Sequence, residues 1–418
     1  MDALMPPLPK DWEAVKVEDI FEIITDFSAA GSFAQQSQMV QYTNDRTNYA
    51  QLIRTTELKN GFNNTNAIYI NKEAFEFLWR VNLNSDAIIL PNIGINCGEI
   101  YYVDIKKLIH KHNALAPNAI LLRAKKANLK FLFYAFLDTW FQKQLINIIT
   151  SSAQPKFTKT DLRDLLIPLP PLNEQIAIAN ILSTLDNYLH ALRALILKKE
   201  SVKKALSFEL LSQRKRLKGF NQAWQKVRLG TYKYRRGSFP QPYGNPQWYS
   251  DNGMPFVQVY DVGENFKLTQ KTKQKISKIA QPMSVFVPKN SVIITLQGTI
   301  GRVALTQYDC YCDRTILIFD NNTLNDVNKY FFVLSLFTKF EEEKRKADGS
   351  IIKTITKQTL KDFEILLPPL NEQIAIANVL SGLDNEIISL KNKKRQFENI
   401  KKALNHDLMS AKIRVLKK

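Results

Sequence analysis

The chain has 418 residues, of which 45% are hydrophobic, and its 58 Lys and Arg against 39 Asp and Glu give a formal net charge of +19. The length predicts two to four domains, and the charge favours a polyanionic partner, with nucleic acid as the first candidate. Three cysteines exclude a disulfide framework, and the sequence has neither a signal-peptide pattern nor an unbroken apolar span, so a cytoplasmic protein without membrane contact is expected.

The first 168 residues have the pattern of a mixed α+β domain. A W-x-x-V-[KR]-[VL] motif opens this part at Trp12, residues 128–149 have helical periodicity, and residues 151–168 form a polar linker. Strands that precede a helix are typical of an α+β domain. The predicted strands are 52–58, 67–70, 86–91 and 98–105.

The first part has little basic excess, so it needs a local surface if it binds DNA. An amide-rich stretch suits hydrogen bonds to base edges, and a disordered polar loop is the alternative. Its candidates are Gln36, Gln38, Gln41, Tyr42, Asn44 and Arg46, with Arg54, Asn92 and Asn96 as weaker ones. Ser151, Ser152 and Lys156 in the linker are candidates for phosphate contacts.

One stretch of the chain occurs twice. Residues 169–187 read LPPLNEQIAIANILSTLDN and residues 367–385 read LPPLNEQIAIANVLSGLDN, so 17 of 19 positions are identical. The offset of 198 residues continues without a gap to Ser212 and Ser410. The protein is therefore a tandem of two halves that end in the same element.

Apolar residues in both copies are spaced by four and three residues, which is the pattern of a coiled coil. The prolines end any preceding helix, so Asn173 and Asn371 are the expected N-caps, with Glu174 and Glu372 against the helix dipoles. Roughly forty residues make a helix about 60 Å long. We expect the two helices to pair antiparallel with a pseudo-two-fold relation; an ordinary core helix in each domain is the alternative. Seam positions hold Lys199, Lys203, Lys394 and Lys401, which restrict the allowed registers.

The second half repeats this order with a different interior. The opening motif recurs at Trp224, a helix is predicted at 328–347, and a polar linker at 349–367. Strands are predicted at 255–262, within 285–305 and at 315–320. The predicted division is a first domain at 1–168, a helix at 169–218, a second domain at 219–366 and a helix at 367–418.

Basic and amide side chains in the second half are the stronger DNA-binding candidates, because Arg and Lys bind phosphates or guanine and Gln binds adenine. Gly237, Pro240 and Pro242 favour a shaped loop around the main group. A solvated basic surface is the alternative. The main candidates are Lys233, Tyr234, Arg235, Arg236, Ser238, Gln241 and Tyr243, followed by Gln297, Thr299, Arg302, Lys271, Lys273, Lys275 and Lys278. Ser350, Lys353 and Lys357 are candidates in the second linker.

The duplicated LPPLNEQ helix, the two domain openings and the GTIGRVAL run at 298–305 resemble the specificity subunit of type I restriction–modification systems. The resemblance covers nearly the whole chain. It implies that each variable domain recognises half of a bipartite double-stranded DNA site. The helices would set the half-site spacing and, with the junctions, hold two adenine-N6 methyltransferase subunits, which restriction subunits join. One departure is that the first domain has NIGINCGEI (92–100) in place of GTIGRVAL.

The resemblance places the partner-binding junctions in the two LPPLNEQ motifs. The residues concerned are Pro170, Pro171, Asn173, Glu174, Gln175, Pro368, Pro369, Asn371, Glu372 and Gln373. It also implies that the chain itself binds no cofactor. S-adenosylmethionine is expected on the partner methyltransferase, and ATP with Mg on a restriction subunit.

No catalytic pattern is evident. Asn245-Pro-Gln-Trp248 lacks the second proline of an adenine-methyltransferase motif, there is no phosphate-binding loop, and the four His form no triad or metal spacing. Cys310 and Cys312 lack a second ligand pair for zinc. We therefore expect a non-catalytic DNA-recognition subunit. The alternatives are an enzyme on nucleic acid with an unrecognised site and a coiled-coil scaffold that reads no sequence.

Overall fold

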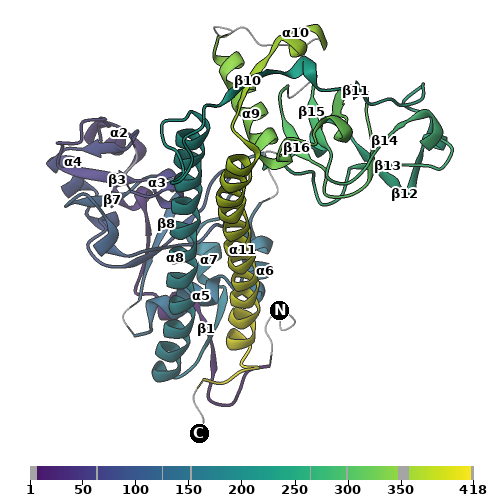
Figure 1. Ribbon diagram of the computed structural model, residues 1–418. Helices are drawn as coiled ribbons and strands as arrows, with labels where there is room; N and C mark the ends of the chain where they lie inside the picture. The colour runs from purple at the N-terminus through teal and green to yellow at the C-terminus, as the bar shows by residue number, and fades with distance from the viewer. Residues whose placement is uncertain are drawn as a thin grey trace. The chain divides into compact units, whose positions relative to one another are not determined.

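The computed structural model describes residues 7–62, 65–124, 126–150, 153–263, 265–297, 300–346 and 357–415. The chain divides into two compact units, Met1–Ala194 with Asn392–Lys418, and Leu195–Lys391. In this division each long helix contributes one part to each unit. Each globular part is mixed α+β, as predicted (Figure 1).

The first unit contains a four-stranded antiparallel sheet that is buried on both faces. Ile88 and Leu90 face the core shared with α5 and α6, whereas Ala87 and Ile89 face the core shared with the second sheet. This explains the continuous apolar run of β5, since a strand covered on both faces does not alternate. The sheet order is β2 (Ile23–Asp26), β8 (Ala119–Arg123), β5 (Ala87–Pro91) and β6 (Tyr101–Val103), and the second sheet is β4 (Ile68–Ile70), β3 (Ala50–Ile53) and β7 (Asn113–Leu115).

Three predicted elements of the first unit were partly wrong. The strand predicted at 98–105 is limited to Tyr101–Val103. The predicted strand at 52–58 ends at Ile53, because Glu57 accepts hydrogen bonds from Arg54 at the start of a helix at Thr55–Asn60. The predicted helix at 128–149 is two helices, because Asp138 accepts a bond from the Trp140 N–H at 3.2 Å and caps the second. The helices are α1 (Val17–Ile20), α2 (Phe33–Met39), α3 (Thr55–Asn60), α4 (Lys72–Phe77), α5 (Leu129–Phe136), α6 (Thr139–Ile148) and α7 (Lys159–Arg163).

The second unit has two four-stranded sheets and one long helix in its globular part. Val292 and Ile294 of β15 pack in the core with α9 (Lys329–Lys346), and Ile293 faces the opposite core. The first sheet is β11 (Tyr234–Arg236), β18 (Ile316–Phe319), β15 (Val292–Thr295) and β16 (Val303–Leu305). The second is β13 (Gln274–Ile276), β12 (Tyr249–Val257), β17 (Cys310–Cys312) and β14 (Val285–Val287).

Short 3₁₀ helices connect these elements. They are η1 (Phe27–Ala30), η2 (Trp79–Val81), η3 (Ile105–Lys107), η4 (Leu229–Thr231), η5 (Pro246–Trp248), η6 (Val259–Asp261), η7 (Gln281–Met283) and η8 (Asn321–Thr323).

Each globular part is closed by a two-stranded antiparallel ribbon. β1 (Glu13–Lys16) pairs with β9 (Leu166–Leu169), and β10 (Gln225–Arg228) pairs with β19 (Glu364–Leu367). The register is the same, with Glu13 opposite Leu169 and Gln225 opposite Leu367. The opening motifs are therefore strands. The polar linkers also contain α7, α10 (Lys357–Asp362) and the two partner strands, which corrects their prediction as plain linkers.

The long helices are α8 (Leu172–Leu211) and α11 (Leu370–Met409), each of 40 residues. Asn173 and Asn371 are not the N-caps that we predicted, because the helices begin at Leu172 and Leu370, two residues earlier than those caps would give. Pro171 O instead accepts bonds from the Glu174 and Gln175 N–H groups, at 2.9 and 3.0 Å. Asn173 Oδ1 lies 2.9 Å from the Glu174 N–H and Asn371 Oδ1 lies 2.9 Å from the Glu372 N–H, so both still contact the exposed first turn.

The helices pair antiparallel within the first unit. Asp186 of α8 binds Lys401 of α11 at 2.5 Å and also accepts a bond from the Tyr134 hydroxyl at 2.7 Å. Burial, with the bond to Asp186, raises the pKa of Tyr134 well above its ordinary value. Further along, Arg193 binds Glu398 at 2.9 Å, and the rings of Tyr188 and Phe397 are 4.7 Å apart, while Lys393 lies over the Tyr188 ring.

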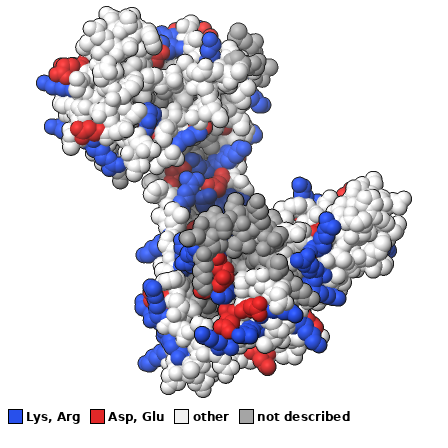
Figure 2. Space-filling view, turned by 90° about the horizontal axis from the view of Figure 1, so that it is seen from above, with Lys and Arg blue, Asp and Glu red and all other residues white. Residues whose placement is uncertain are grey.

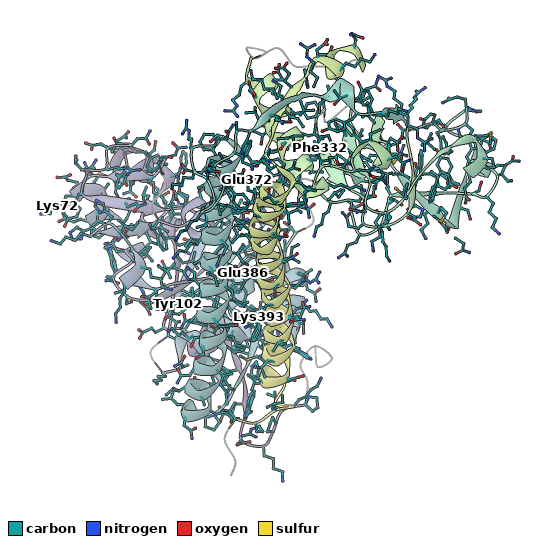
Figure 3. The ribbon with its side chains drawn as sticks, viewed as in Figure 1. Lys72, Tyr102, Phe332, Glu372, Glu386 and Lys393 are labelled. Carbon is teal, nitrogen blue, oxygen red and sulfur yellow. The ribbon has the colours of Figure 1, made fainter. Side chains whose placement is uncertain are left out.

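The second unit repeats these contacts with the two helices exchanged. Asp384 lies 198 positions after Asp186, and Lys203 lies 198 positions before Lys401. Asp384 and Lys203 bind each other. The Tyr330 hydroxyl donates to Asp384 as the Tyr134 hydroxyl does to Asp186. Lys391 and Glu200 form the equivalent of the Arg193–Glu398 pair, at 2.6 Å. At the positions that correspond to the aromatic pair Tyr188 and Phe397, the second unit has an ion pair, Glu386 with Lys199 at 2.8 Å. Glu386 and Lys393 are labelled on α11 in Figure 3.

The predicted antiparallel pairing is thus confirmed within each unit. The predicted restriction of register also has a physical basis, since Lys203 and Lys401 meet carboxylate partners on the facing helix at only one register. Among the described residues, no helix is both long enough and apolar enough to cross a membrane.

Candidate nucleic-acid interface

An open cleft of about 240 Å³ in the second unit brings together four segments that are far apart in the sequence. These segments are the loop after β11, the start of η6, the end of β15 and the turn between β17 and β18. The side chains that line the cleft are Tyr243, Gln258, Val259, Tyr260, Gln297, Asp313, Arg314 and Thr315. We had predicted two of them, Tyr243 and Gln297.

A buried carboxylate organises this cleft. Asp313 is 3% exposed, and its Oδ1 accepts bonds from the Thr315 N–H at 2.8 Å and the Thr315 hydroxyl at 2.6 Å. Its Oδ2 accepts a bond from the Tyr243 hydroxyl at 2.5 Å. Burial, with this bond, raises the pKa of Tyr243 above its ordinary value. The Tyr243 ring is therefore fixed, because its hydroxyl is anchored at a buried group.

Two side chains of the cleft are available to a ligand. The Arg314 guanidinium lies over the Tyr243 ring, 5.2 Å from its centroid, and forms no hydrogen bond or ion pair with any described residue. Gln297 is exposed and likewise has no hydrogen bond within the described part of the chain. Lys273, a predicted residue, lies over the Tyr260 ring at 5.0 Å but is not part of the cleft lining. The cleft therefore presents hydrogen-bonding groups of the kind that contact base edges.

The predicted basic group after β10 is divided by the structure. Tyr234, Arg235 and Arg236 form strand β11, so the loop that we expected begins only at Gly237. The Tyr234 ring packs against Phe319, and the Ser238 hydroxyl donates to Met283 O at 3.0 Å, so these two residues have internal roles. Arg235 donates to Phe286 O at 3.3 Å but remains exposed. The side chains of Lys233, Arg236 and Gln241 are exposed and stay candidates.

Other predicted residues of the second unit have different positions. The Arg302 guanidinium donates to Val262 O at 3.2 Å, which gives it a structural role beside β16. Lys271 is exposed, and Lys275 donates to Asp251 O at 2.9 Å. Thr299, Ser350 and Lys353 lie outside the described residues.

In the first unit, the predicted amide-rich stretch lines a pocket of about 650 Å³. Residues 33–39 form helix α2, with Ser32 and Gln35 in a reciprocal cap, so this part of the stretch is not the disordered loop of the alternative. The Gln36 amide donates to Phe27 O at 3.3 Å and Gly31 O at 2.7 Å, which leaves it an internal role. Tyr42 is 55% exposed at the pocket, beside Gln41, whose amide donates to Ser37 O at 2.9 Å.

The remaining predicted residues of the first unit are partly accounted for. Arg54 is paired with the buried Glu57 at 2.6 Å and donates to Asn66 O, so it is not available to DNA. Asn92 is buried and donates to Phe157 O, and Asn96 accepts a bond from Lys59. Gln38, Asn44, Arg46 and Lys156 are exposed, whereas Ser151 and Ser152 lie outside the described residues.

The second polar residue after each asparagine of the LPPLNEQ motifs is a buried glutamine that makes the same hydrogen bonds in both units. We call these two glutamine side chains the struts. Gln175 donates to Pro170 O at 2.7 Å and accepts from the Asn128 N–H at 2.9 Å, and Gln373 does the same with Pro368 O and the Asn328 N–H. These side chains are 3% and 2% exposed. They connect each long helix to the start of a helix of its globular part, α5 in the first unit and α9 in the second. In this structure they have no surface to offer a partner.

The buried glutamates of the motifs are neutralised by arginines that our sequence reasoning missed. Glu174, 2% exposed, binds Arg414 at 2.8 Å and accepts from the Trp12 indole at 3.2 Å. Glu372 of the second unit binds Arg216 at 2.5 Å. Arg216 and Arg414 are again 198 residues apart, so the repeat offset was the signal that could have found them. Glu372 is labelled near the start of α11 in Figure 3.

The opposite face of each motif is exposed and apolar. Leu172 and Ile176 are 51% and 43% exposed, and their counterparts Leu370 and Ile374 are 42% and 41% exposed. The asparagines between them are also exposed. Residues four apart lie on one helix face, so each first turn presents a small apolar surface. We call these the docking patches: Leu172, Asn173, Ile176 and Asn180 on α8, and Leu370, Asn371, Ile374 and Asn378 on α11.

Charge is uneven over the surface. Figure 2 shows Lys and Arg side chains along one flank of the lobe that holds the second unit's sheets, with few acidic side chains beside them. Within the described ranges, no group of three or more His, Cys, Asp or Glu could hold a metal ion.

Comparison with known proteins identifies the family. Residues 9–199 and 240–399 match the family model described as the type I restriction modification DNA specificity domain. Two relatives come from Methanocaldococcus jannaschii and are named for the specificity subunits of the type I restriction enzymes MjaX and MjaVIII. They are 28% and 25% identical, over 98% of this chain and 95% and 94% of their own lengths. The crystal structure of a type I restriction–modification S subunit from M. genitalium has the same fold, with a TM-score of 0.61 and 15% identity over 97% of this chain and 98% of that one.

The matched residues cover most of both globular parts and of both long helices. The predicted resemblance is therefore confirmed. The chain belongs to the type I restriction modification DNA specificity family, as a specificity subunit that recognises DNA sequence.

Proposed function

We propose that each globular part recognises one half of a bipartite double-stranded DNA site, and that the paired helices set the distance between the halves. The proposal is supported by a contrast between the elements that attach the globular parts, which are the same in both units, and the side chains that line their surfaces, which differ. The ribbons, the struts and the helix contacts are repeated in both units. The cleft of the second unit and the pocket of the first have unrelated linings, which suits two unlike half-sites.

The chain holds two copies of an adenine-N6 methyltransferase subunit, one at each docking patch. The patches support a pair of equal partners because they consist of the same residue types, lie at the same place on their helices and are exposed to a similar degree. Exposed apolar surface that recurs in this way is typical of an interaction site.

Catalysis belongs to the partners in this proposal. The chain binds no cofactor, S-adenosylmethionine is on the methyltransferase subunits, and ATP with Mg is on two restriction subunits where these join. The assembly works inside the cell, where its DNA substrate lies. Activity of the purified chain alone on DNA would contradict this part.

Placing a charge on one docking patch should remove one partner copy. We expect Ile176→Asp or Ile374→Asp alone to give complexes with one methyltransferase, and the double variant to give none, because a buried carboxylate without a partner is costly. Complex mass from light scattering measures the copy number. Leu197→Asp is the matched control, since Leu197 is 64% exposed on α8 and Arg395 stands at the equivalent position of α11. Two bound copies in the double variant would place the partner elsewhere.

Lengthening both helices together tests their role in spacing. Seven residues inserted after Ala194 and seven after Lys391 keep the seven-residue seam and leave each ion pair within its own unit. We expect a spacer longer by about three base pairs, because seven residues add about 10 Å of helix, with both half-sites unchanged. Methylation mapping measures the spacer. An active complex with the original spacer would contradict the role of the helices.

The experiment that tests the function as a whole is a methylation map of genomic DNA from cells that express this chain with its methyltransferase, and with each omitted. N6-methyladenine at one split motif, only when both are present, is the expected result. The same motif without this chain would show that it does not choose the sequence, which would favour the scaffold alternative.

A further inference from the structure

The second unit's cleft contains an arginine whose orientation is fixed before any ligand arrives. Asp313 anchors the Tyr243 hydroxyl at 2.5 Å, and Arg314 lies over the Tyr243 ring at 5.2 Å. The Tyr249 hydroxyl donates to Tyr243 O at 2.7 Å and holds the same loop from the other side. A guanidinium that is stacked on a held ring loses little freedom when it binds, so its N–H groups are in place for a planar ligand.

The surroundings of Arg314 favour a base edge over a phosphate. Gln297 and Gln258, which line the same cleft, are neutral amides, and Asp313 places a buried carboxylate next to Arg314 in sequence. A phosphate in this cleft would be repelled by that carboxylate, whereas a neutral base would not. The exposed lysines of this unit, such as Lys271, have the freedom that phosphate contacts require and lie outside the cleft lining.

We infer that Arg314 reads a guanine of the second unit's half-site through its O6 and N7 atoms, with Tyr243 and Asp313 as positioning residues. Two parallel N–H groups of arginine match these two acceptors, and no other base presents the same pair in the major groove. The inference rests on the proposed function, because it assigns a base to the half-site that the second unit recognises.

The test is a methylation map of the complete complex with wild-type chain, Arg314→Ala and Arg314→Lys. The wild-type half-site should contain an invariant guanine. In Arg314→Ala that position should accept other bases, with discrimination reduced roughly tenfold to hundredfold, while the other half-site is unchanged. Arg314→Lys should reduce discrimination at this position by an intermediate amount, because lysine keeps the positive charge but lacks the two parallel N–H donors of arginine.

Tyr243→Phe keeps the ring and removes the bond to Asp313, so it should relax the same position only, and by less. Lys271→Ala is the matched control: it should weaken methylation of all sequences alike and relax no position. Unfolding temperature checks that each variant folds. Arg314 is exposed, so its replacement should leave that temperature unchanged.

The results separate the two proposals. A wild-type motif that does not depend on this chain contradicts the proposed function. A split motif that stays the same in Arg314→Ala, that loses strength uniformly, or that has no guanine in the half-site affected by cleft variants contradicts the role of Arg314 alone.

Discussion

A methyl group added at Gly237 is expected to abolish recognition of one half-site, whereas the same change at Gly244 is expected to be nearly silent. A Cβ at Gly237 would lie 2.2 Å from Cys312 O and 2.3 Å from Asp313 O, which are backbone atoms at the end of β17 and in the turn that follows it. The strand or the turn must shift to relieve this overlap. Because Asp313 anchors Tyr243, the shift would displace Arg314 as well.

Methylation of the split motif measures this effect in Gly237→Ala, together with the free energy of unfolding. We expect a loss of about 3 kcal/mol, at the upper end for overpacking, and no methylation that depends on the second half-site. Gly244 is in the same loop and has nothing within 4 Å of its added Cβ, so Gly244→Ala controls for the substitution itself. Equal activity of the two variants would show that the turn adapts without moving the cleft.

Arg414→Ala is expected to be the most destabilising surface substitution in the first unit. Arg414 binds Asp11 at 2.7 Å and Glu174 at 2.8 Å, and these bonds, with Asp11 first, raise its pKa. Without the guanidinium, Glu174 stays 2% exposed, and among the described residues the Trp12 indole is its one remaining side-chain partner. A buried carboxylate that loses its cation destabilises a protein by about 3 kcal/mol.

Urea unfolding measures the loss, and Lys412→Ala is the control because Lys412 is 63% exposed and 3.9 Å from its partner Asp407. Adding Glu174→Gln to Arg414→Ala should recover part of the stability, since the uncompensated charge is then removed. A similar loss in Lys412→Ala, or no recovery in the double variant, would mean that the buried charge is not the cause.

The sequence predicts those features that depend on local periodicity. The long helices, their antiparallel pairing and most of the strands follow from apolar spacing. The repeat shows that the two halves end in the same element. The predicted start of each helix is wrong by two residues, because Pro171 and Pro369, not the asparagines, supply the first acceptors. The break at Asp138 was missed because a capping aspartate inside an apolar run does not alter the periodicity on either side.

The cleft of the second unit could not be predicted from the sequence for a different reason. Tyr243, Gln297 and Arg314 come together only through the pairing of β11, β15 and β18, which long-range contacts determine. Residues chosen for charge alone included Arg54 and Arg302, which bind within the chain. The sequence does not show whether a basic side chain already binds a carboxylate or a carbonyl oxygen within the protein. The one cue for Arg314 was its place in a polar triplet directly before an apolar strand.

The duplicated frame has a consequence for how such a chain can change in evolution. The ribbon, the glutamine strut and the arginine–glutamate pair attach each globular part at its own ends, and none of them uses a residue of the cleft or of the amide-rich pocket. A globular part could thus be exchanged as a cassette between its ribbon and its strut, with the rest of the chain unaltered. The protein could acquire a new half-site in a single genetic event and keep its partners throughout.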